Sequence, residues 1–133
     1  MKKLSVDTTR HREVLDITER LNALIGEAAF KSGLCHLLLL HTTAALTLAD
    51  LDPGTDLDIL DAFTEMVPKL RYRHPHNPAH VPHHILSALI GTSLTLPVAD
   101  GRLVLGTWQR VVLVEFEGPR RRELAVTLLP AAL

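Results

Sequence analysis

Length, composition and charge place this chain among small globular proteins. Its 133 residues suffice for one domain of this size, which buries about two-thirds of its unfolded surface, so we expect a single compact domain over residues 1–133. The formal net charge is −1 at pH 7, and acidic and basic residues are mixed along the chain. This balance excludes the basic surface typical of proteins that bind nucleic acid or anionic membranes.

No segment of the sequence indicates a membrane span or an internal disulfide. The start MKKLSVDTTR is basic but no apolar stretch follows it, and no segment reaches the roughly 18 apolar residues of a span. The single cysteine, Cys35, lies in an apolar run, where we expect a small buried residue. We therefore expect a soluble, cytoplasmic protein that does not contact membranes.

The first predicted elements are a strand-like opening and a helix. Apolar residues recur at three- and four-residue steps and predict a helix over about residues 17–32. Asp16 followed by Glu19 resembles a capping box, and Gly33 is predicted to end the helix in a left-handed conformation.

Two buried strands and a second helix are predicted next. Residues 34–50, LCHLLLLHTTAALTLAD, form two apolar runs with a turn or bulge near Thr42, which is typical of buried strands. Residues 54–70, GTDLDILDAFTEMVPKL, predict a helix capped by Thr55 or Asp56 and ended by Pro68. Its predicted buried stripe consists of Leu57, Leu60, Ala62, Phe63 and Val67.

The second half of the chain predicts one short helix followed by strands. HHILSALIG forms the helix, closed by Gly91, and SLTLPV, LVLGTWQRVVLVEFE and RELAVTLL form the strands, with turns at ADGR and GPR. Antiparallel hairpins at the end favour an α+β fold over a repeated βαβ unit. We expect mixed, mainly antiparallel sheets with two to three helices.

Histidines flank the first apolar run, at His36 and His41. Five positions apart, they project to opposite faces of a regular strand and cannot both bind one ion there. His41 is the better site candidate because it lies at the strand end beside two threonines. For His36 we favour a core histidine that is hydrogen-bonded to a backbone carbonyl.

The stretch HPHNPAHVPHHI, residues 74–85, carries five of the eight histidines and three prolines. Imidazole is a common metal ligand, but no familiar zinc spacing is present, and adjacent histidines rarely converge on one ion. A metal site and a solvated, histidine-biased loop therefore both remain open on these residues alone. The prolines restrict the loop to a defined path.

Two further motifs carry possible chemistry. In GTWQ, residues 106–109, Trp108 is predicted to pack in the core, with substrate stacking as the alternative. Strand alternation places Gln109 on the same side as Val111, Leu113 and Glu115. The turn GPRRRE carries Arg120 to Arg122, which either bind an anion by bidentate hydrogen bonds or form a solvated basic run.

The combination of HLLLLHTTAALTL, YRH and HHILSALIGTSLTLPVADGRLVLGTWQRVVLVEFEGPRRRE resembles the YjbQ-like family, described as secondary thiamine-phosphate synthases. The resemblance covers roughly residues 34–128 in the same order. It implies a compact α+β fold, a homotrimer, and a polar pocket built around histidines with a divalent metal. The implied activity joins a pyrimidine diphosphate to a thiazole phosphate.

Residue by residue, the resemblance implies that His41, His74 and His84 bind the divalent metal, with zinc as the expected ion. Each comes from a separate predicted element, as an open three-ligand site requires. The remaining histidines of the stretch, His76, His80 and His83, fall at variable positions and are assigned to the surface.

The resemblance also implies catalytic and phosphate-binding residues. Ser87 and Gln109 match directly as hydrogen-bond partners. Asp50 stands where relatives often carry a glutamate and is a possible base of shorter reach. Basic residues at the same place in relatives imply that the cofactor- or substrate-phosphate is held by Arg120, Arg121 and Arg122.

Two classes of function follow. The first is a thiamine-phosphate synthase-like transferase that acts on a phosphorylated small molecule, with metal-assisted electrostatics. The second is a non-catalytic homotrimer that binds a metal or ligand. The chain lacks an Asp-rich magnesium–diphosphate motif and the length of a barrel, as ordinary synthases of this chemistry have.

Overall fold

The computed structural model describes residues 1–74 and 77–132. Three α-helices, one short 3-10 helix and eight strands form this part of the chain, and the predicted α+β class is confirmed. The elements are β1 (Lys2–Asp7), β2 (Glu13–Asp16), α1 (Thr18–Glu27), β3 (Gly33–Leu39), β4 (Ala44–Ala49), α2 (Thr55–Met66), η1 (Pro78–His80), α3 (Val81–Ile90), β5 (Ser93–Ala99), β6 (Arg102–Leu103), β7 (Arg110–Glu115) and β8 (Arg121–Pro130).

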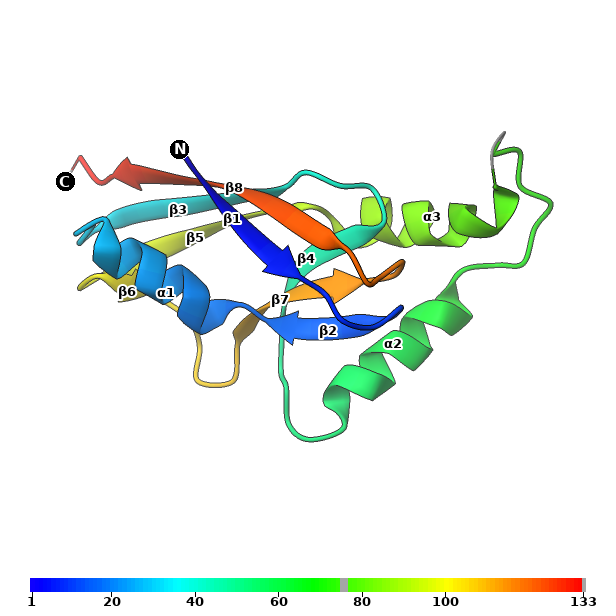
Figure 1. The fold of residues 1–133 in the computed structure, drawn as a ribbon. Coiled ribbons are helices and arrows are strands. Elements are labelled where there is room, and N and C mark those ends of the chain that lie inside the picture. The colour runs from blue at the N-terminus through cyan, green and yellow to red at the C-terminus, as the bar shows by residue number, and fades with distance from the viewer. Residues whose placement is uncertain (75–76, 133) are drawn as a thin grey trace.

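The strands form two sheets, and all pairs between described strands are antiparallel. The large sheet has the order β1-β8-β3-β5-β6, and the small sheet has the order β2-β7-β4. Figure 1 shows α1 beside the small sheet, with both lying on one side of the large sheet, while α2 and α3 lie at the other end of the molecule.

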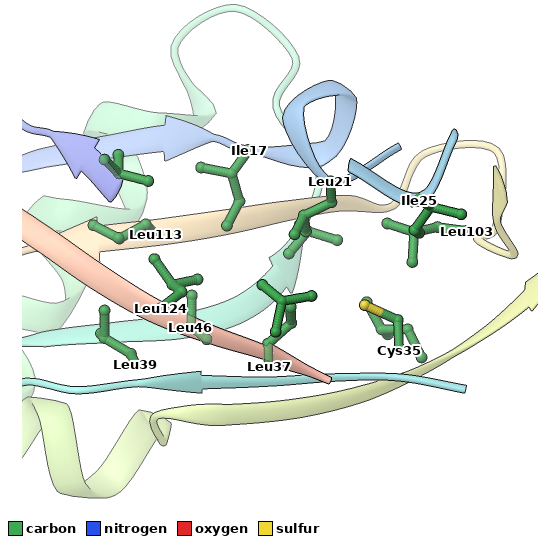
Figure 2. Close-up of a cluster of buried hydrophobic side chains, with 14 of the residues drawn as sticks. Ile17, Leu21, Ile25, Cys35, Leu37, Leu39, Leu46, Leu103, Leu113 and Leu124 are labelled. Carbon is green, nitrogen blue, oxygen red and sulfur yellow. The ribbon is translucent and has the colours of Figure 1, made fainter. Parts of the chain in front are cut away.

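The main core lies between the large sheet and the layer formed by α1 and the small sheet. Figure 2 shows Leu37, Leu39 and Leu124 of the large sheet pointing toward Ile17 and Leu21. The buried positions recur at every second residue in the strands and at every fourth residue from Ile17 into α1. The spacing of apolar residues in the sequence therefore predicts that these side chains are buried. Burying side chains of this size contributes about 1.5–3 kcal/mol each.

A second core lies on the other face of the small sheet. Val112, Val114 and Phe116 pack there against Leu60 of α2 and Leu86 of α3. The neighbouring residues Val111 and Leu113 belong to the main core instead, so the predicted alternation along β7 is confirmed. The small sheet is therefore buried on both faces, which explains the nearly continuous apolar run of this strand.

The first helix is shorter than predicted. It ends at Glu27, and Ala29 rather than Gly33 adopts the left-handed conformation, with φ 52°. Asp16 does accept a hydrogen bond from the N–H of Thr18 at 3.0 Å, but Glu19 does not return a bond to the cap. Gly33 begins β3 instead, with φ 146°.

Two further expectations are wrong. The GTWQ segment forms the turn between β6 and β7 rather than a strand, and Trp108 is 71% exposed instead of buried. On α2, Leu57 is exposed, because the helix contacts the small sheet through Leu60 and the partly buried Phe63. The sequence pattern overestimated how much of this helix is covered.

The outer face of the large sheet is uncovered, and exposed leucines alternate there with polar residues such as His36, Thr95 and Thr127. Leu34 and Leu38 of the central strand β3 and Leu40 just beyond its end have exposed fractions of 43%, 38% and 44%. His36 lies on this face as well, within 3.0 Å of the Thr95 hydroxyl, and not in the core as predicted. Among the described residues, no helix is long and apolar enough to cross a membrane.

Candidate functional site

A polar cleft of about 610 Å³ opens where β3 leads into β4 and where β7 leads into β8. Three segments distant in sequence meet there: the β3–β4 connection, the β7–β8 connection and the start of α3. We name this site the histidine–arginine cleft. It brings together five of the predicted site residues, His41, His84, Arg120, Arg121 and Arg122, and it is also lined by Leu40, Thr42, Thr43, His80 and Glu117.

His41 lies just beyond the end of β3, where its ring is fixed by the neighbouring strand. Its Nε2 accepts a hydrogen bond from the N–H of Glu123 in β8 at 2.8 Å. Burial and, next, the charge of Arg122 lower the pKa of His41, while Glu115 and Glu123 oppose the shift. The ring is therefore neutral at pH 7, and its proton sits on Nδ1.

His84 lies in the first turn of α3 and lines the cleft. Its Nδ1 donates to the carbonyl oxygen of Thr42 at 3.0 Å, which leaves the Nε2 lone pair as the acceptor. The ring of His74 stacks on it, with centroids 5.2 Å apart and planes 10° apart. The two predicted ligands His74 and His84 are thus neighbours, although His74 is not among the residues that line the cleft. His76 lies outside the described residues.

The histidines as they are arranged do not fit a three-histidine metal site. His41 uses its lone pair for the Glu123 amide, and Nδ1 of His74 accepts from the N–H of Asn77 at 3.1 Å. A histidine that binds a metal through one ring nitrogen usually donates a hydrogen bond from the other nitrogen. Of the three, only His84 is arranged in this way. Within residues 1–74 and 77–132, no three His, Cys, Asp or Glu side chains are placed to hold one ion.

Glu117 forms the acidic floor of the cleft. His83 Nδ1 donates to its Oε1 at 2.7 Å, and Nδ1 of His80 and Nη2 of Arg120 lie at 3.4 and 3.5 Å from its oxygens. Burial opposes ionisation, but the His83 hydrogen bond and the charges of His80, His83 and Arg120 lower the pKa of Glu117. This carboxylate is therefore ionised at neutral pH and orients two of the histidines assigned to the surface.

Arg122 is the buried member of the arginine run. It is 2% exposed and forms an ion pair with Glu115, which is 0% exposed. Nη2 also donates to the carbonyl and hydroxyl oxygens of Thr43 at 3.1 and 2.9 Å. Arg122 thus ties β8 to β7 and to the turn before β4, beneath the cleft.

Arg120 and Arg121 are the exposed members of the run. Nε of Arg120 donates to the Glu117 carbonyl at 2.8 Å, and Nε of Arg121 lies 3.2 Å from Asp7. Pairs at this exposure contribute little to stability, so both guanidinium groups can exchange these contacts for a ligand.

Ser87, a predicted catalytic residue, is placed beneath the cleft rather than in it. It is buried, and its hydroxyl donates to the carbonyl oxygen of Ala44 at 2.6 Å. Because Ser87 lies one turn after His84 on α3, this bond holds the helix on β4 and sets where the His84 ring lies.

Asp50 and Gln109 lie away from the cleft. Asp50 follows β4 and lines a small cavity of about 230 Å³ with Trp108. Gln109 sits in the turn before β7, where its Oε1 accepts from the N–H of Gly106 at 2.8 Å. Neither residue joins the histidines within one chain.

Sequence reasoning missed Glu117, and it noted Glu115 only as sharing a strand face. Both acids lie in the apolar segment at the end of β7. Burying an unpaired carboxylate is costly, so an acid in such a segment indicates that a buried cation or hydrogen-bond donor lies beside it. Thr43 was likewise seen only as a neighbour of His41. Its oxygens accept hydrogen bonds from Arg122.

Cys35 is expected to be unreactive in the folded protein. Its side chain is fully buried in the main core, and burial raises the pKa of the thiol to about 11. The thiolate is the reactive form, so a thiol reagent at pH 8 should label Cys35 only after unfolding. Stoichiometric labelling of the native protein within minutes would contradict this placement.

Fold and cleft together define a small α+β protein with a histidine-rich polar site. Residues 2–131 match the family described as UPF0047 protein YjbQ-like, and the chain belongs to this family. It is 35% identical over 128 residues to the UPF0047 protein of Methanocaldococcus jannaschii, covering 96% of this chain and 92% of that one. Its identity to the UPF0047 protein YjbQ of Salmonella typhimurium is 44% over 112 residues, covering 80% and 79%.

Solved structures share the same fold. A YbjQ-like protein of unknown function from Sulfolobus solfataricus superposes with a TM-score of 0.89 at 31% identity, covering 98% of this chain and 96% of that one. A conserved hypothetical protein from Thermus thermophilus has a TM-score of 0.86 at 36% identity, covering 97% and 100%. The predicted family membership is therefore confirmed.

Proposed function

We propose that the histidine–arginine cleft binds the phosphate group of a phosphorylated small molecule. The observation that supports this proposal is that one cleft gathers His41, His84 and the whole arginine run. Guanidinium groups match phosphate oxygens in bidentate geometry, and neutral imidazole N–H groups add donors without a net charge.

The histidines and arginines of the cleft have donors or acceptors left for a ligand. Arg122 lines the cleft, and among the described residues its Nη1 has no acceptor. The Nδ1–H of His41 is a further donor. Arg120 and Arg121 supply flexible charge at the rim, and His84 offers Nε2 as an acceptor.

The activity we propose is a thiamine-phosphate synthase-like transfer, which rests on the family resemblance. The arginines supply electrostatic stabilisation of phosphate oxygens, and the His84 imidazole supplies a ring nitrogen for hydrogen bonding. The alternative is a protein that binds the same class of ligand without turnover. Incubation with phosphorylated metabolites, followed by mass spectrometry of the products, distinguishes a transferase from a binding protein. Binding without product formation supports the binding protein.

Phosphate binding is expected to depend on the exposed arginines. Because each charge-assisted hydrogen bond contributes about 1.5–3 kcal/mol, the double variant Arg120→Ala/Arg121→Ala should bind pyrophosphate at least about tenfold more weakly in calorimetry. Arg102→Ala removes an equally exposed arginine on β6 and serves as the control. Equal affinity of the native and double-variant proteins would exclude the cleft as the phosphate site.

A divalent metal at His41, His74 and His84 stays a separate prediction. It requires His41 and His74 to give up the backbone hydrogen bonds described above. Elemental analysis of untagged protein tests this rearrangement. About one zinc per chain, lost in His84→Ala, retained in His80→Ala and reduced below pH 6.5, where free histidine gains a proton, would support it. Native protein free of metal after purification with zinc present would contradict it.

We also propose that the chain assembles as a homotrimer. Three exposed leucines on the outer face of the large sheet, Leu34, Leu38 and Leu40, support assembly, since exposed apolar side chains that gather on a sheet surface mark interaction sites. The number three rests on the family resemblance.

A further inference from the structure

The predicted site residues fall into two groups at opposite ends of the β4–β7 pair. Ala44 pairs with Glu115 at the cleft end, and Ala49 pairs with Arg110 at the end that leads to Asp50 and Trp108. Five steps along a strand separate the two ends by roughly 17 Å. One copy of the chain therefore cannot bring Asp50 to its own His84.

The far end presents exposed carboxylates beside an exposed indole. We name it the aspartate–tryptophan corner; Asp16, Asp50, Asp52 and Trp108 line it together with one arginine, Arg110. Asp16 pairs with Arg110 at 2.7 Å, whereas Asp50 accepts only the N–H of Asp52, and neither Asp50 nor Asp52 has an ion-pair partner among the described residues. A tryptophan that is 71% exposed is a large apolar surface left without a partner in the single chain.

The histidine–arginine cleft offers exposed cations for Asp50 and Asp52, whereas the corner's own Arg110 is paired with Asp16. Its exposed charges are the guanidinium groups of Arg120 and Arg121, while its carboxylate, Glu117, is buried. Leu40 adds an exposed apolar side chain at the rim. An indole packs favourably on guanidinium, imidazole and leucine, and the aspartates find cations.

We propose that Trp108 and Asp50 of one copy enter the histidine–arginine cleft of a neighbouring copy, so that the site is complete only in the assembly. This inference rests on the oligomer proposed above. A contact between two different patches is head-to-tail, and three such contacts related by a 120° rotation close into the ring that a trimer requires. A two-fold contact of the corner with itself would instead place aspartates against aspartates.

The single tryptophan of the chain makes the contact measurable by fluorescence. In the native assembly, acrylamide should quench Trp108 roughly threefold less than in Arg120→Glu/Arg121→Glu, because a side chain in an interface core is shielded from water. Arg102→Glu is the matched control and should leave quenching unchanged. Native quenching as strong as that of free tryptophan, in protein shown by light scattering to be assembled, would overturn the proposal.

Cross-linking tests the same contact without depending on the charge variants. In Thr42→Cys/Trp108→Cys, a short bismaleimide should give covalent dimers and trimers, since Cys35 is buried. Trp108→Cys alone should stay monomeric on a denaturing gel. Cross-linking of the single variant, or none in the double variant, would overturn the head-to-tail contact. Pyrophosphate affinity is measured separately, so loss of phosphate binding and loss of the contact are distinguished.

Discussion

Replacing Arg122 with methionine should lower the free energy of unfolding by about 3–5 kcal/mol at pH 7, because it leaves a buried carboxylate without its counter-charge. Glu115 is fully buried, and beyond Arg122 it keeps only the Thr8 hydroxyl at 2.7 Å and two backbone N–H groups. Methionine preserves much of the apolar stem, so the change isolates the lost charge and hydrogen bonds.

The pH dependence distinguishes this cause from simple loss of packing. Burial opposes ionisation of Glu115, but hydrogen bonds from Arg122, Thr8 and the Glu117 amide, with the Arg122 charge, lower its pKa. A carboxyl with a lowered pKa stabilises the fold above its unfolded pKa, and this stabilisation is lost as pH falls through the folded value. Without Arg122, burial dominates and the pKa of Glu115 rises. Protonation of Glu115 then removes the buried charge and reduces the loss of stability in the variant.

Urea unfolding at pH 7 and at pH 5 measures both effects. The difference between native protein and Arg122→Met should shrink at the lower pH. Arg121→Met, a change in the exposed neighbour, should alter stability by no more than about 0.5 kcal/mol. An Arg122→Met variant within about 1 kcal/mol of the native protein at pH 7 would show that the pair is not needed for the fold.

The fold class was predictable because its signals are local and periodic. The alternation of Val111 to Val114 gave both faces of β7 correctly, and Gly91 ends α3 as predicted. The residue at which α1 ends could not be predicted from the spacing of apolar residues. Ala28 and Ala29 continue the apolar pattern, but the chain must turn there to begin β3, and Ala29 takes the left-handed conformation.

The cleft could be predicted only in part, because its residues come together through strand register. His41, His84 and the arginine run each stand at the end of an element, and the sequence marked them as candidates. Which arginine is buried follows from alternation along β8, where Arg122 shares its face with Leu124 and Val126. The placement of Asp50 depends on the pairing of β4 with β7, which no local pattern encodes.

The variant Leu34→Lys/Leu38→Lys should convert the assembly to single chains. Both leucines project from the middle of the large sheet, and their register partners on the flanking strands, Pro97 and Ala125 among them, extend the same face. Two lysines there add charge to a surface that subunits are proposed to bury, and removing these ammonium groups from water costs several kcal/mol each.

Light scattering at micromolar concentration should give the native protein about three times the 14.7 kDa chain mass and the double variant the mass of one chain. Leu57→Lys/Leu89→Lys changes two leucines that are at least as exposed but lie on α2 and α3, so this control should stay assembled. Because the substituted side chains point away from the main core, the variant should keep its circular dichroism spectrum. A native protein at single-chain mass would refute the trimer, and an assembled double variant would move the interface away from this sheet face.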